Sequence, residues 1–415
     1  MPVDRTEALE LHRRAQGKIK LSPTISIRNK QDLAMAYIQG GAIAAKEIQA
    51  NREAVYELTG KRDRLAIISN GTSLLGQEHY GPEAALPMIE GKCLLYKRFG
   101  DVNALPLCVN TTEIDQLTDF CRLLAPTVGA INLEDIKSPT DFLLVRKLRK
   151  ELDIPIFADD MHCSSAVILG SLFNALKVVG KELDSVKIVI VGAGTSAIAT
   201  AELMLHAGAQ NIVMLNRQGI IHPEMESLNG VQRFILDRLN PEGLRGGLET
   251  AIRGADILIG LTGQPKAFGK EHVALMAPQS VVFPLTRPVP EMTQNEAKEA
   301  GAAVVGCGIM DGINCMPNLA IFPGFTRGIL DVRATGLTFG VQLKVAREYA
   351  DNVDTSRLGP DHITPFIFSD QLVPRIAEAV AQACVEEGLA RIVPQPQEVY
   401  EKTWNRLFGG HIAKF

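Results

Sequence analysis

The stretch that most constrains the fold of this chain is residues 187–217, KIVIVGAGTSAIATAELMLHAGAQNIVMLNR. It joins an apolar run, a glycine-rich turn, a helix-like segment and a second apolar run, which is the order of a βαβ unit. Gly192 permits the tight turn, Gly194 lets the backbone approach a pyrophosphate, and Ala197 allows the helix to pack closely on the strand. The free N–H groups at the start of that helix favour an anion. The pattern predicts a dinucleotide site made by Gly192, Gly194, Thr195, Ser196 and Ala197, with a purely structural glycine turn as the alternative.

The end of the second strand bears on the choice between NAD and NADP. An acid at this position usually binds both ribose hydroxyls of NAD, but this chain has Asn216 followed by Arg217. A neutral amide removes the repulsion against a 2′-phosphate, and a guanidinium can pair with one. The pair favours NADP over NAD, while NAD stays open because Arg217 could instead stack on an adenine or point to solvent.

Apolar runs on both sides of this unit extend the strand pattern. Further runs at 255–261, 280–285 and 303–305 predict a doubly wound parallel sheet. Upstream, short apolar runs alternate with helix-like segments, so a second parallel sheet is expected. The chain of 415 residues is too long for one core. We therefore predict an α/β fold with two domains. Residues 160–316 form a Rossmann-type dinucleotide-binding domain, a doubly wound parallel sheet. Residues 1–159 with 317–415 form a catalytic domain that binds substrate and metal and includes helical N- and C-terminal segments.

Two of the apolar runs end in adjacent acids. Residues 154–157 lead to Asp159 and Asp160, and residues 129–133 lead to Glu134 and Asp135. Because burying an unpaired carboxylate is costly, these acids are expected to meet a cation or a substrate. Carboxylates at the ends of neighbouring strands are the oxygen ligands that a divalent metal requires. The sequence therefore predicts a Mg²⁺ or Mn²⁺ site.

Composition narrows the class of protein. A net charge of −4, with no basic stripe and no nucleic-acid motif, argues against a nucleic-acid partner. The N-terminal segment is polar and charged, unlike a signal peptide, and no run approaches the roughly 20 apolar residues needed to span a bilayer. The seven cysteines form no CxxC pair and are odd in number, which is typical of reduced thiols. We expect a cytoplasmic protein with no membrane partner.

A series of blocks along the chain carries a family resemblance. The blocks are DLAMAY, YELTGK, AIISNGTSLLG, MIEGK, INLEDI, DDMH, VGAGTSAIA and IFPGFTRGILDVRAT. In this order and spacing the chain resembles the bacterial-type malic enzymes over nearly its whole length. The resemblance implies metal-assisted oxidative decarboxylation of a 2-hydroxy acid, and it implies a homodimer, which apolar helices at both ends of the chain also favour.

The resemblance also implies roles for particular residues. The implied ligands of the divalent metal are Glu134, Asp135 and Asp160. Lys92 matches the general base, Tyr37 the general acid, and Asp159 the neighbour that orients the lysine, while Asn318 lies on the substrate side. A lysine base must be desolvated or set beside other cations such as the metal. The metal would polarise the forming ketone and stabilise the enolate, whose carbon Tyr37 would protonate.

Local patterns give these residues a setting and an ordinary structural alternative. We expect Lys92 in a turn after an apolar run, and Tyr37 beside a break at Gly40-Gly41 in a helix over 30–49. Taken alone, Lys92 would be a surface lysine, Tyr37 a core or helix-face tyrosine, and the acids after residue 133 helix caps. His162 is expected to be structural. Cys163 is expected to be a packed thiol, because no activating His-Asp pair is evident.

Several substrate loops depart from the pattern of that family. Thr286-Arg287-Pro288 stands where the family has an asparagine before the proline, Pro317 replaces the first of two asparagines, and Gly76-Gln77-Glu78 alters another loop. A guanidinium beside a metal and a lysine is unfavourable unless the substrate brings extra negative charge. We hypothesise a 2-hydroxy acid with a larger or more anionic tail than malate, such as a carboxylate, phosphonate or phosphate. The predicted substrate-binding residues are Arg287, Asn318, Gln39 and His79, with Tyr80 shaping the pocket. In the alternative, Arg287 turns outward and the substrate is malate.

Three functions are therefore open. The first is metal- and NAD(P)-dependent oxidative decarboxylation of a small anionic, malate-like 2-hydroxy acid. The second keeps the hydride transfer without the decarboxylation. The third is a non-catalytic metabolite-sensing protein, and the retained Tyr37, Lys92 and strand-end acids argue against it.

Overall fold

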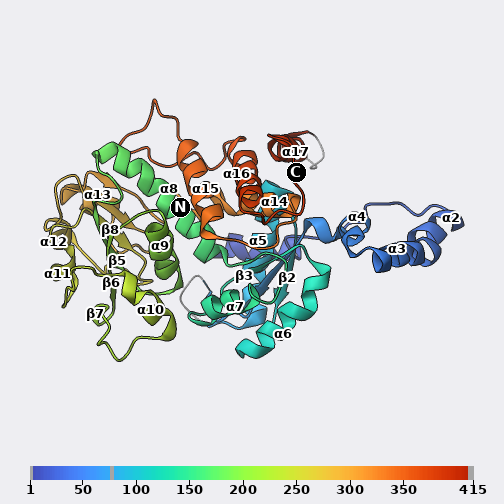
Figure 1. Ribbon diagram of the computed structural model, residues 1–415, viewed down its shortest axis with the longest axis horizontal. Helices are drawn as coiled ribbons and strands as arrows, with labels where there is room; N and C mark the ends of the chain where they lie inside the picture. The colour runs from blue at the N-terminus through green and yellow to red at the C-terminus, as the bar shows by residue number, and fades with distance from the viewer. Residues whose placement is uncertain (1–2, 75–78, 410–415) are drawn as a thin grey trace.

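The computed structural model describes residues 3–74 and 79–409. It contains a four-stranded and a six-stranded sheet, side by side, with helices around and between them (Figure 1). The α/β fold class predicted from the sequence is confirmed. The predicted loop change at residues 76–78 lies outside the described residues.

The four-stranded sheet is parallel, in the order β2-β1-β3-β4. Its elements are β1 (Arg64–Ser69), β2 (Asn103–Cys108), β3 (Ala130–Leu133) and β4 (Ile156–Phe157), with helices α5 (Pro82–Gly100), α6 (Ile114–Leu124) and α7 (Thr140–Leu148). β1 and β3 are buried nearly throughout and are mostly apolar, as strands covered on both faces are, with Asn132 as a polar exception within β3. Parallel strands bring their carboxyl ends to one edge, so the acids that follow β3 and β4 meet there.

The six-stranded sheet has the order β10-β9-β8-β5-β6-β7. Its strands are β5 (Lys187–Val191), β6 (Asn211–Asn216), β7 (Gly219–Ile220), β8 (Ile257–Gly260), β9 (Val281–Pro284) and β10 (Val304–Val305). Its helices are α9 (Thr195–His206), α10 (Gly230–Ile235), α11 (Leu248–Ile252), α12 (Lys270–Val273) and α13 (Gln294–Glu299). The winding reverses between β5 and β8, and nucleotides bind beyond the carboxyl ends of strands at such a switch point. β7 runs antiparallel to β6, so one edge of the predicted parallel sheet is mixed.

The long helix α8 (Asp159–Val179) connects the two sheets (Figure 1). Among the described residues it is the one helix long and apolar enough to cross a bilayer, and 72% of its most apolar window is buried inside the protein. A helix that is apolar all round is typical of a core. A Cβ at Gly170 would lie 2.5 Å from the carbonyl oxygen of Ala346, so glycine permits close packing of the C-terminal helices on α8.

The C-terminal helices contact both halves of the molecule. They are α14 (Phe322–Asp331), α15 (Phe339–Asp351), α16 (Leu372–Glu386) and α17 (Glu398–Phe408). α14 packs on α16 and on α5, whereas α15 packs on α8 and α9. A short 3-10 turn, Asn318–Ala320, precedes α14 and lies against α8. The division of the chain into 1–159 with 317–415 and 160–316 stays a prediction.

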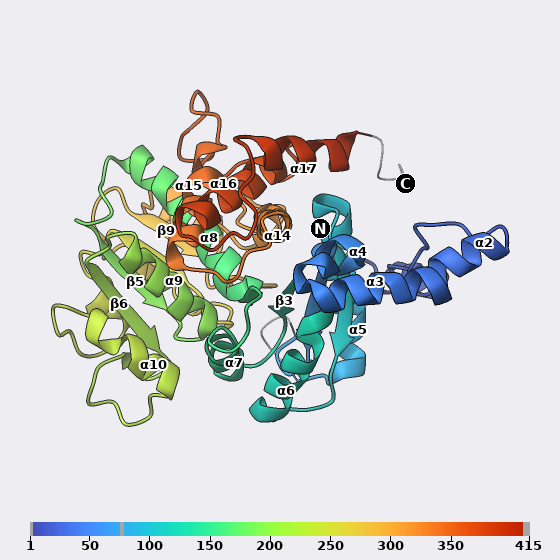
Figure 2. The same ribbon diagram turned by 45° about the vertical axis from the view of Figure 1, so that its right-hand side comes forward.

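The N-terminal region carries a helical arm that stands away from the sheets (Figures 1 and 2). After α1 (Arg5–Ala15), the arm consists of α2 (Lys30–Leu33), a π-helical turn (Ala34–Ile38) and α3 (Gln39–Ala50), and it leads to α4 (Val55–Leu58). The predicted break at Gly40-Gly41 is wrong, because the helix continues through both glycines. The irregularity is the π turn before them, where a Cβ at Gly40 would lie 1.8 Å from the carbonyl oxygen of Met35.

The segment around Lys92 also differs from its prediction. Lys92 lies in the middle of α5 and not in a turn. Pro87 and Gly91 disfavour the helix locally. Ala85, Ile89 and Tyr96 form a fully buried face, and the burial of such a face outweighs that cost.

Candidate active site

A lysine and two acids from three segments meet at the carboxyl edge of the four-stranded sheet. Lys92 comes from α5, Glu134 follows β3, and Asp159 begins α8. The ammonium of Lys92 donates to Glu134 Oε1 at 3.1 Å and makes a shorter ion pair with Asp159 Oδ2. The side chain of Asp159 is fully buried, whereas those of Lys92 and Glu134 keep 13% and 10% of their surface exposed. A substrate can therefore reach Lys92 and Glu134 while Asp159 supports them from behind.

Two asparagine amides hold Asp159 in place. Asn132 donates to Asp159 Oδ1 at 3.3 Å and to Glu134 Oε2 at 3.1 Å, and it accepts the backbone N–H of Asp159 at 3.1 Å. Asn318 donates to Asp159 Oδ2 at 2.8 Å and to Asp160 Oδ1 at 3.4 Å. Asn132 was missed in the sequence, although a polar residue within the buried strand AINL is a signal of such a role.

An aromatic ring covers the ammonium of Lys92. The Nζ atom lies 4.4 Å from the centroid of the Phe322 ring, at the start of α14. That ring lies 4.6 Å from the ring of Tyr96, one turn after Lys92 on α5. A desolvated cation–π contact contributes about 2 kcal/mol. The ring therefore excludes water from one side of the cluster and stabilises the charge on Lys92.

The cluster carries more negative than positive charge. Burial acts to lower the pKa of Lys92, but Asp159, Glu134 and Asp160 outweigh it, so the pKa is raised. Burial, with Asp159 next, raises the pKa of Glu134 well above its usual range and also raises that of Asp160. Burial acts to raise the pKa of Asp159, but the charge of Lys92 outweighs it and holds that pKa below its usual value. The surplus negative charge suits a further cation.

The predicted metal ligands are only partly gathered. Glu134 and Asp160 belong to the cluster, and oxygen donors of this kind fit Mg²⁺ or Mn²⁺. Asp135 has a left-handed backbone, with a φ of 52°. Burial raises the pKa of the Cys108 thiol, and the negative charge of Asp135 raises it further. Within the part of the chain that the structure describes, no three acidic, histidine or cysteine side chains are grouped to hold a metal. The charge of Glu134, Asp135 and Asp160 therefore suits a divalent metal ion. That these three side chains coordinate the ion together stays a prediction.

The glycine-rich turn follows β5 at the switch point of the six-stranded sheet. Gly192 has a φ of 121°, and a Cβ there would lie 2.2 Å from the carbonyl oxygen of Leu261, after β8. Glycine is therefore required for the turn. A Cβ at Gly194 would meet nothing within 4 Å, so there is open space above the N-terminus of α9. Ala197 is buried, which allows α9 to pack closely.

The residues around that turn have distinct contacts. Thr195 is buried and donates its hydroxyl to Asp141 of α7 at 2.9 Å, which connects the glycine-rich loop to the other sheet. Ser196 is half-buried at the start of α9. Asn216 accepts the N–H of Gln218 at 2.8 Å within its own turn, and Arg217 lies at the surface. The sequence did not single out Asp141.

Arg287 follows β9 on a braced loop. Its guanidinium offsets part of the rise in the pKa of Asp160, which places it in electrostatic range of the cluster. The neighbouring Thr286 N–H donates to the fully buried carboxylate of Glu291 at 3.1 Å, and the Thr262 N–H donates to it at 3.0 Å. Arg287 itself is exposed on an anchored turn, and its charge acts on Asp160.

Two of the predicted residues, Tyr37 and Gln39, lie apart from the cluster in a single chain. Tyr37 is 72% exposed, and with Gln39 it lies on the arm, whose main contacts are within itself and with α4. His79 is exposed next to the undescribed residues 75–78. One chain therefore does not bring Tyr37 to Lys92.

His162 and Cys163, beside the acids on α8, are structural groups. His162 is buried, contacts the carbonyl oxygen of Ala158 at 2.7 Å through Nδ1, and accepts from Arg149 through Nε2 at 2.8 Å. Burial, with Arg149 next, lowers the pKa of His162 to about 3, so the ring is neutral. Cys163 is fully buried, and burial raises the pKa of its thiol well above the usual range. Both observations agree with the structural roles predicted from the sequence.

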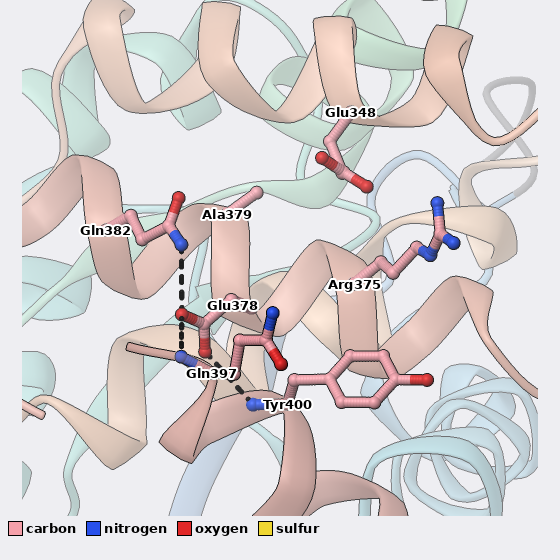
Figure 3. Close-up of a pocket in the computed structure, with 7 residues that line it drawn as sticks. All are labelled: Glu348, Arg375, Glu378, Ala379, Gln382, Gln397 and Tyr400. Atoms are coloured by element: carbon pink, nitrogen blue, oxygen red, sulfur yellow. Dashed lines mark hydrogen bonds between the residues drawn. The ribbon is translucent and has the colours of Figure 1, made fainter. Parts of the chain in front are cut away.

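A hollow of about 430 Å³ between α15, α16 and α17 does not suit the predicted anionic substrate (Figure 3). Two of its lining residues, Glu348 and Glu378, are acids. Glu378 accepts the N–H groups of Gln397 at 3.1 Å and Tyr400 at 3.0 Å, and it also accepts from a glutamine amide. With Arg375 also in the lining, the hollow has two acids against one base and is braced by its own contacts.

Comparison with known proteins identifies the family. The malic enzyme N-terminal domain matches residues 12–149, and the malic enzyme NAD binding domain matches residues 161–386. A bifunctional malic/malolactic enzyme of Bacillus subtilis is 40% identical, over 96% of this chain and 97% of its own length. An NADP-dependent malic enzyme of Halomonas elongata is 36% identical, over 98% and 99%. The crystal structure of a malic enzyme from Pyrococcus horikoshii superposes with a TM-score of 0.94 at 36% identity, over 99% of this chain and 97% of that one. The chain belongs to the malic enzyme family and is an NAD(P)-dependent, decarboxylating oxidoreductase.

Proposed function

We propose that this enzyme oxidises and decarboxylates malate, or a malate-like 2-hydroxy acid, at the Lys92 cluster, with a divalent metal and NAD or NADP. The observation that supports this most directly is the position of Lys92, held by Asp159 and Glu134 with part of its side chain exposed. The family membership supports an enzyme over a non-catalytic sensor.

In this proposal Lys92 takes the proton of the substrate hydroxyl, and a dinucleotide held at the glycine-rich turn after β5 would supply the hydride acceptor. When bound, a divalent metal supplies a Lewis acid that polarises the forming ketone and stabilises the enolate. The carboxylates raise the pKa of Lys92 because their charge is in surplus. A bound cation would offset that surplus of negative charge, which lowers the pKa of Lys92 and makes the free amine easier to reach. Phe322 keeps water away from one side of the amine.

The test is turnover of malate with Mn²⁺ and each of the two cofactors. We expect the wild-type enzyme to reduce the cofactor, and Lys92→Met to lose at least about 100-fold in kcat, the effect of removing a general base. Turnover by folded Lys92→Met within about threefold of wild type, an effect below 1 kcal/mol, would overturn the assignment of the base.

We further propose that Arg287 binds the tail of the substrate and selects one with more negative charge than malate. The charge of Arg287 acts on the acidic cluster, and the loop that carries it is anchored by Glu291. A guanidinium on an anchored loop near the cluster gains most from a carboxylate, phosphonate or phosphate on the substrate. Asn318, Gln39 and His79 would complete the pocket.

A panel of malate and longer or phosphorylated 2-hydroxy acids tests this selectivity. We expect Arg287→Asn to lower kcat/KM for the more anionic acid by about 10-fold to 100-fold, the effect of one charge-assisted hydrogen bond, and to change malate less. Ordinary malate turnover that Arg287→Asn leaves unchanged, with no better substrate in the panel, would refute the proposal and favour plain malate.

We propose that the active enzyme is a homodimer in which Tyr37 reaches the Lys92 cluster of the second copy. No residue of α2, the π turn or α3 is buried, and the large apolar side chains Leu33, Met35, Ile38 and Ile43 are exposed there. Such an arm is not expected to be stable in isolation. A second copy of the chain would cover it and supply Tyr37 as the acid that protonates the enol carbon.

Mixing two inactive variants tests this arrangement. A heterodimer of Tyr37→Phe with Lys92→Met contains one intact site if the two residues come from different copies, and no intact site if they come from the same copy. We expect co-expressed chains to recover activity that neither variant has alone. Failure of a purified, folded heterodimer to recover activity would contradict the proposal.

We propose NADP as the preferred cofactor, because Arg217 lies at the surface beside Asn216 at the end of β6.

We also propose a cytoplasmic enzyme without nucleic-acid or membrane partners. A net charge of −4 opposes binding to nucleic acid, and the one bilayer-length helix among the described residues lies mostly within the core.

A further inference from the structure

The loop between β10 and Asn318 carries two cysteines that face each other. The Cys307 N–H donates to Asn314 O at 3.2 Å, and the Met316 N–H donates to Cys307 O at 3.0 Å. Cys307 and Cys315 are therefore paired residues of a parallel β-bridge. Neighbouring β segments lie about 4.8 Å apart, and a disulfide needs Cα atoms about 4.4–6.8 Å apart. The backbone already holds the spacing of a disulfide.

The side chains are also in contact. Cys315 lowers the pKa of the Cys307 thiol through an interaction between the two side chains, while the Cys307 thiol itself donates to Ile309 O at 3.1 Å. A Cβ at Gly312 would lie 2.2 Å from the Cys307 sulfur, so glycine lets the loop fold tightly over it. Cys307 is buried, whereas Cys315 is only partly buried. The pair is reachable from solvent through Cys315.

The loop is fixed on both sides of the pair. The Asn314 amide donates to Val305 O at 3.0 Å and to Pro360 O at 2.8 Å. The Gln294 amide donates to Ile313 O at 2.7 Å. These bonds keep the two thiols together, as a pair poised for oxidation requires.

The pair also borders the proposed substrate site. Asn318 follows Cys315 by three residues and donates to Asp159 and Asp160. The charge of Arg287 acts on Cys315. Forming a covalent bond of about 2.05 Å draws the two sulfurs closer than contact distance, so oxidation would pull on the segment that positions Asn318.

We propose that Cys307 and Cys315 form a reversible disulfide that lowers turnover when a peroxide oxidises the enzyme. The effect on turnover rests on the proposed function, whereas the bond itself does not. Each thiol loses its hydrogen, the S–S bond forms, the O–O bond of hydrogen peroxide breaks, and two water molecules leave. A dithiol reductant reverses the reaction by thiol–disulfide exchange. Transient redox-sensing disulfides of this kind occur in reducing compartments.

Peptide mass tests the bond without reference to activity. The full-length protein is treated with hydrogen peroxide, alkylated and digested with trypsin. Residues 299–327 form one tryptic peptide that contains Cys307, Cys315 and no other cysteine. We expect this peptide to escape alkylation and to be lighter by two hydrogens, and cleavage before Asp311 to leave two fragments joined by the disulfide. Alkylation of both cysteines after peroxide would overturn the proposal.

Turnover with matched variants tests the consequence. Oxidation is expected to lower kcat/KM by roughly 10-fold to 100-fold, the cost of displacing a positioning group by about 1 Å, and dithiothreitol to restore it. Cys315→Ser is expected to resist peroxide, while Cys121→Ser, on α6, is expected to respond like wild type. Equal sensitivity of Cys315→Ser and wild type would refute the switch. If malate is not turned over at all, the proposed function fails and the peptide mass still decides the disulfide.

Discussion

Replacing Asp159 by asparagine separates catalytic positioning from simple stabilisation. Asp159→Asn keeps the volume of the side chain but removes the charge that pairs with Lys92, and it places an amide NH₂ against the donor amides of Asn132 and Asn318. Removing one partner of a buried ion pair costs about 3–5 kcal/mol. Because Lys92 keeps Glu134 at 3.1 Å, we expect the lower end of that range. That cost is expected in the stability of the fold. Separately, we expect a loss of about 100-fold in kcat, because Lys92 is no longer held in place and a misplacement of about 1 Å can cost that much.

The assay is cofactor reduction with malate and Mn²⁺, with thermal unfolding measured on the same samples. Asp331→Asn is the matched control, because Asp331 is also a buried carboxylate, paired with Arg327 and Arg406 at 2.7 Å, outside the cluster. The control should lose about 3 kcal/mol of stability with kcat unchanged. Asp159 does not position Lys92 for catalysis if folded Asp159→Asn keeps kcat within about threefold of wild type. The same follows if Asp331→Asn loses as much kcat as Asp159→Asn does.

Further predictions concern the cofactor, the substrate and pH. Gly194→Ala should fold normally, because its Cβ meets nothing within 4 Å, and should raise the KM for the dinucleotide by about tenfold, or 1.4 kcal/mol; an unchanged KM would place the pyrophosphate elsewhere. Arg217→Gln should weaken the binding of NADP by about 1.5–3 kcal/mol and leave the binding of NAD nearly unchanged, as measured by the KM for each cofactor. Asn318→Ala should lower kcat/KM for the substrate by about tenfold or more, since it removes two hydrogen bonds to carboxylates, and an unchanged value would leave Asn318 without a role. Burial acts to raise the pKa of Asp331, but Arg327 and Arg406 hold it below the usual value. Its contribution to stability is therefore full above the unfolded pKa of about 3.9 and is lost as pH falls through the folded pKa, so in urea titrations wild type and Asp331→Asn should converge in acid.

The sequence predicts those features that depend on local pattern and on sheet geometry. The turn at Gly192 could be predicted because its conformation excludes other residues. The meeting of Glu134 and Asp159 could be predicted because parallel strands end at one edge. Both inferences need only short segments and the rule that neighbouring parallel strands share a direction.

Other features depend on packing that a short segment does not reveal. Pro87 and Gly91 argue against a helix around Lys92, yet the buried face of α5 decides the outcome. The π turn before Gly40 depends on one close backbone approach. The position of Tyr37 relative to Lys92 depends on what covers the arm, which the pattern of a short segment does not reveal.

The central claim is that this enzyme couples hydride transfer to loss of CO₂ at the Lys92 cluster. The most direct measurement is the stoichiometry of the products formed from malate, with CO₂, reduced cofactor, pyruvate and lactate determined in one sample. We expect one CO₂ and one pyruvate for each cofactor reduced in the wild-type enzyme, and none of the three in Lys92→Met. Reduced cofactor without CO₂ would contradict this claim and indicate a dehydrogenase, and CO₂ with lactate but no net reduced cofactor would indicate a malolactic reaction instead.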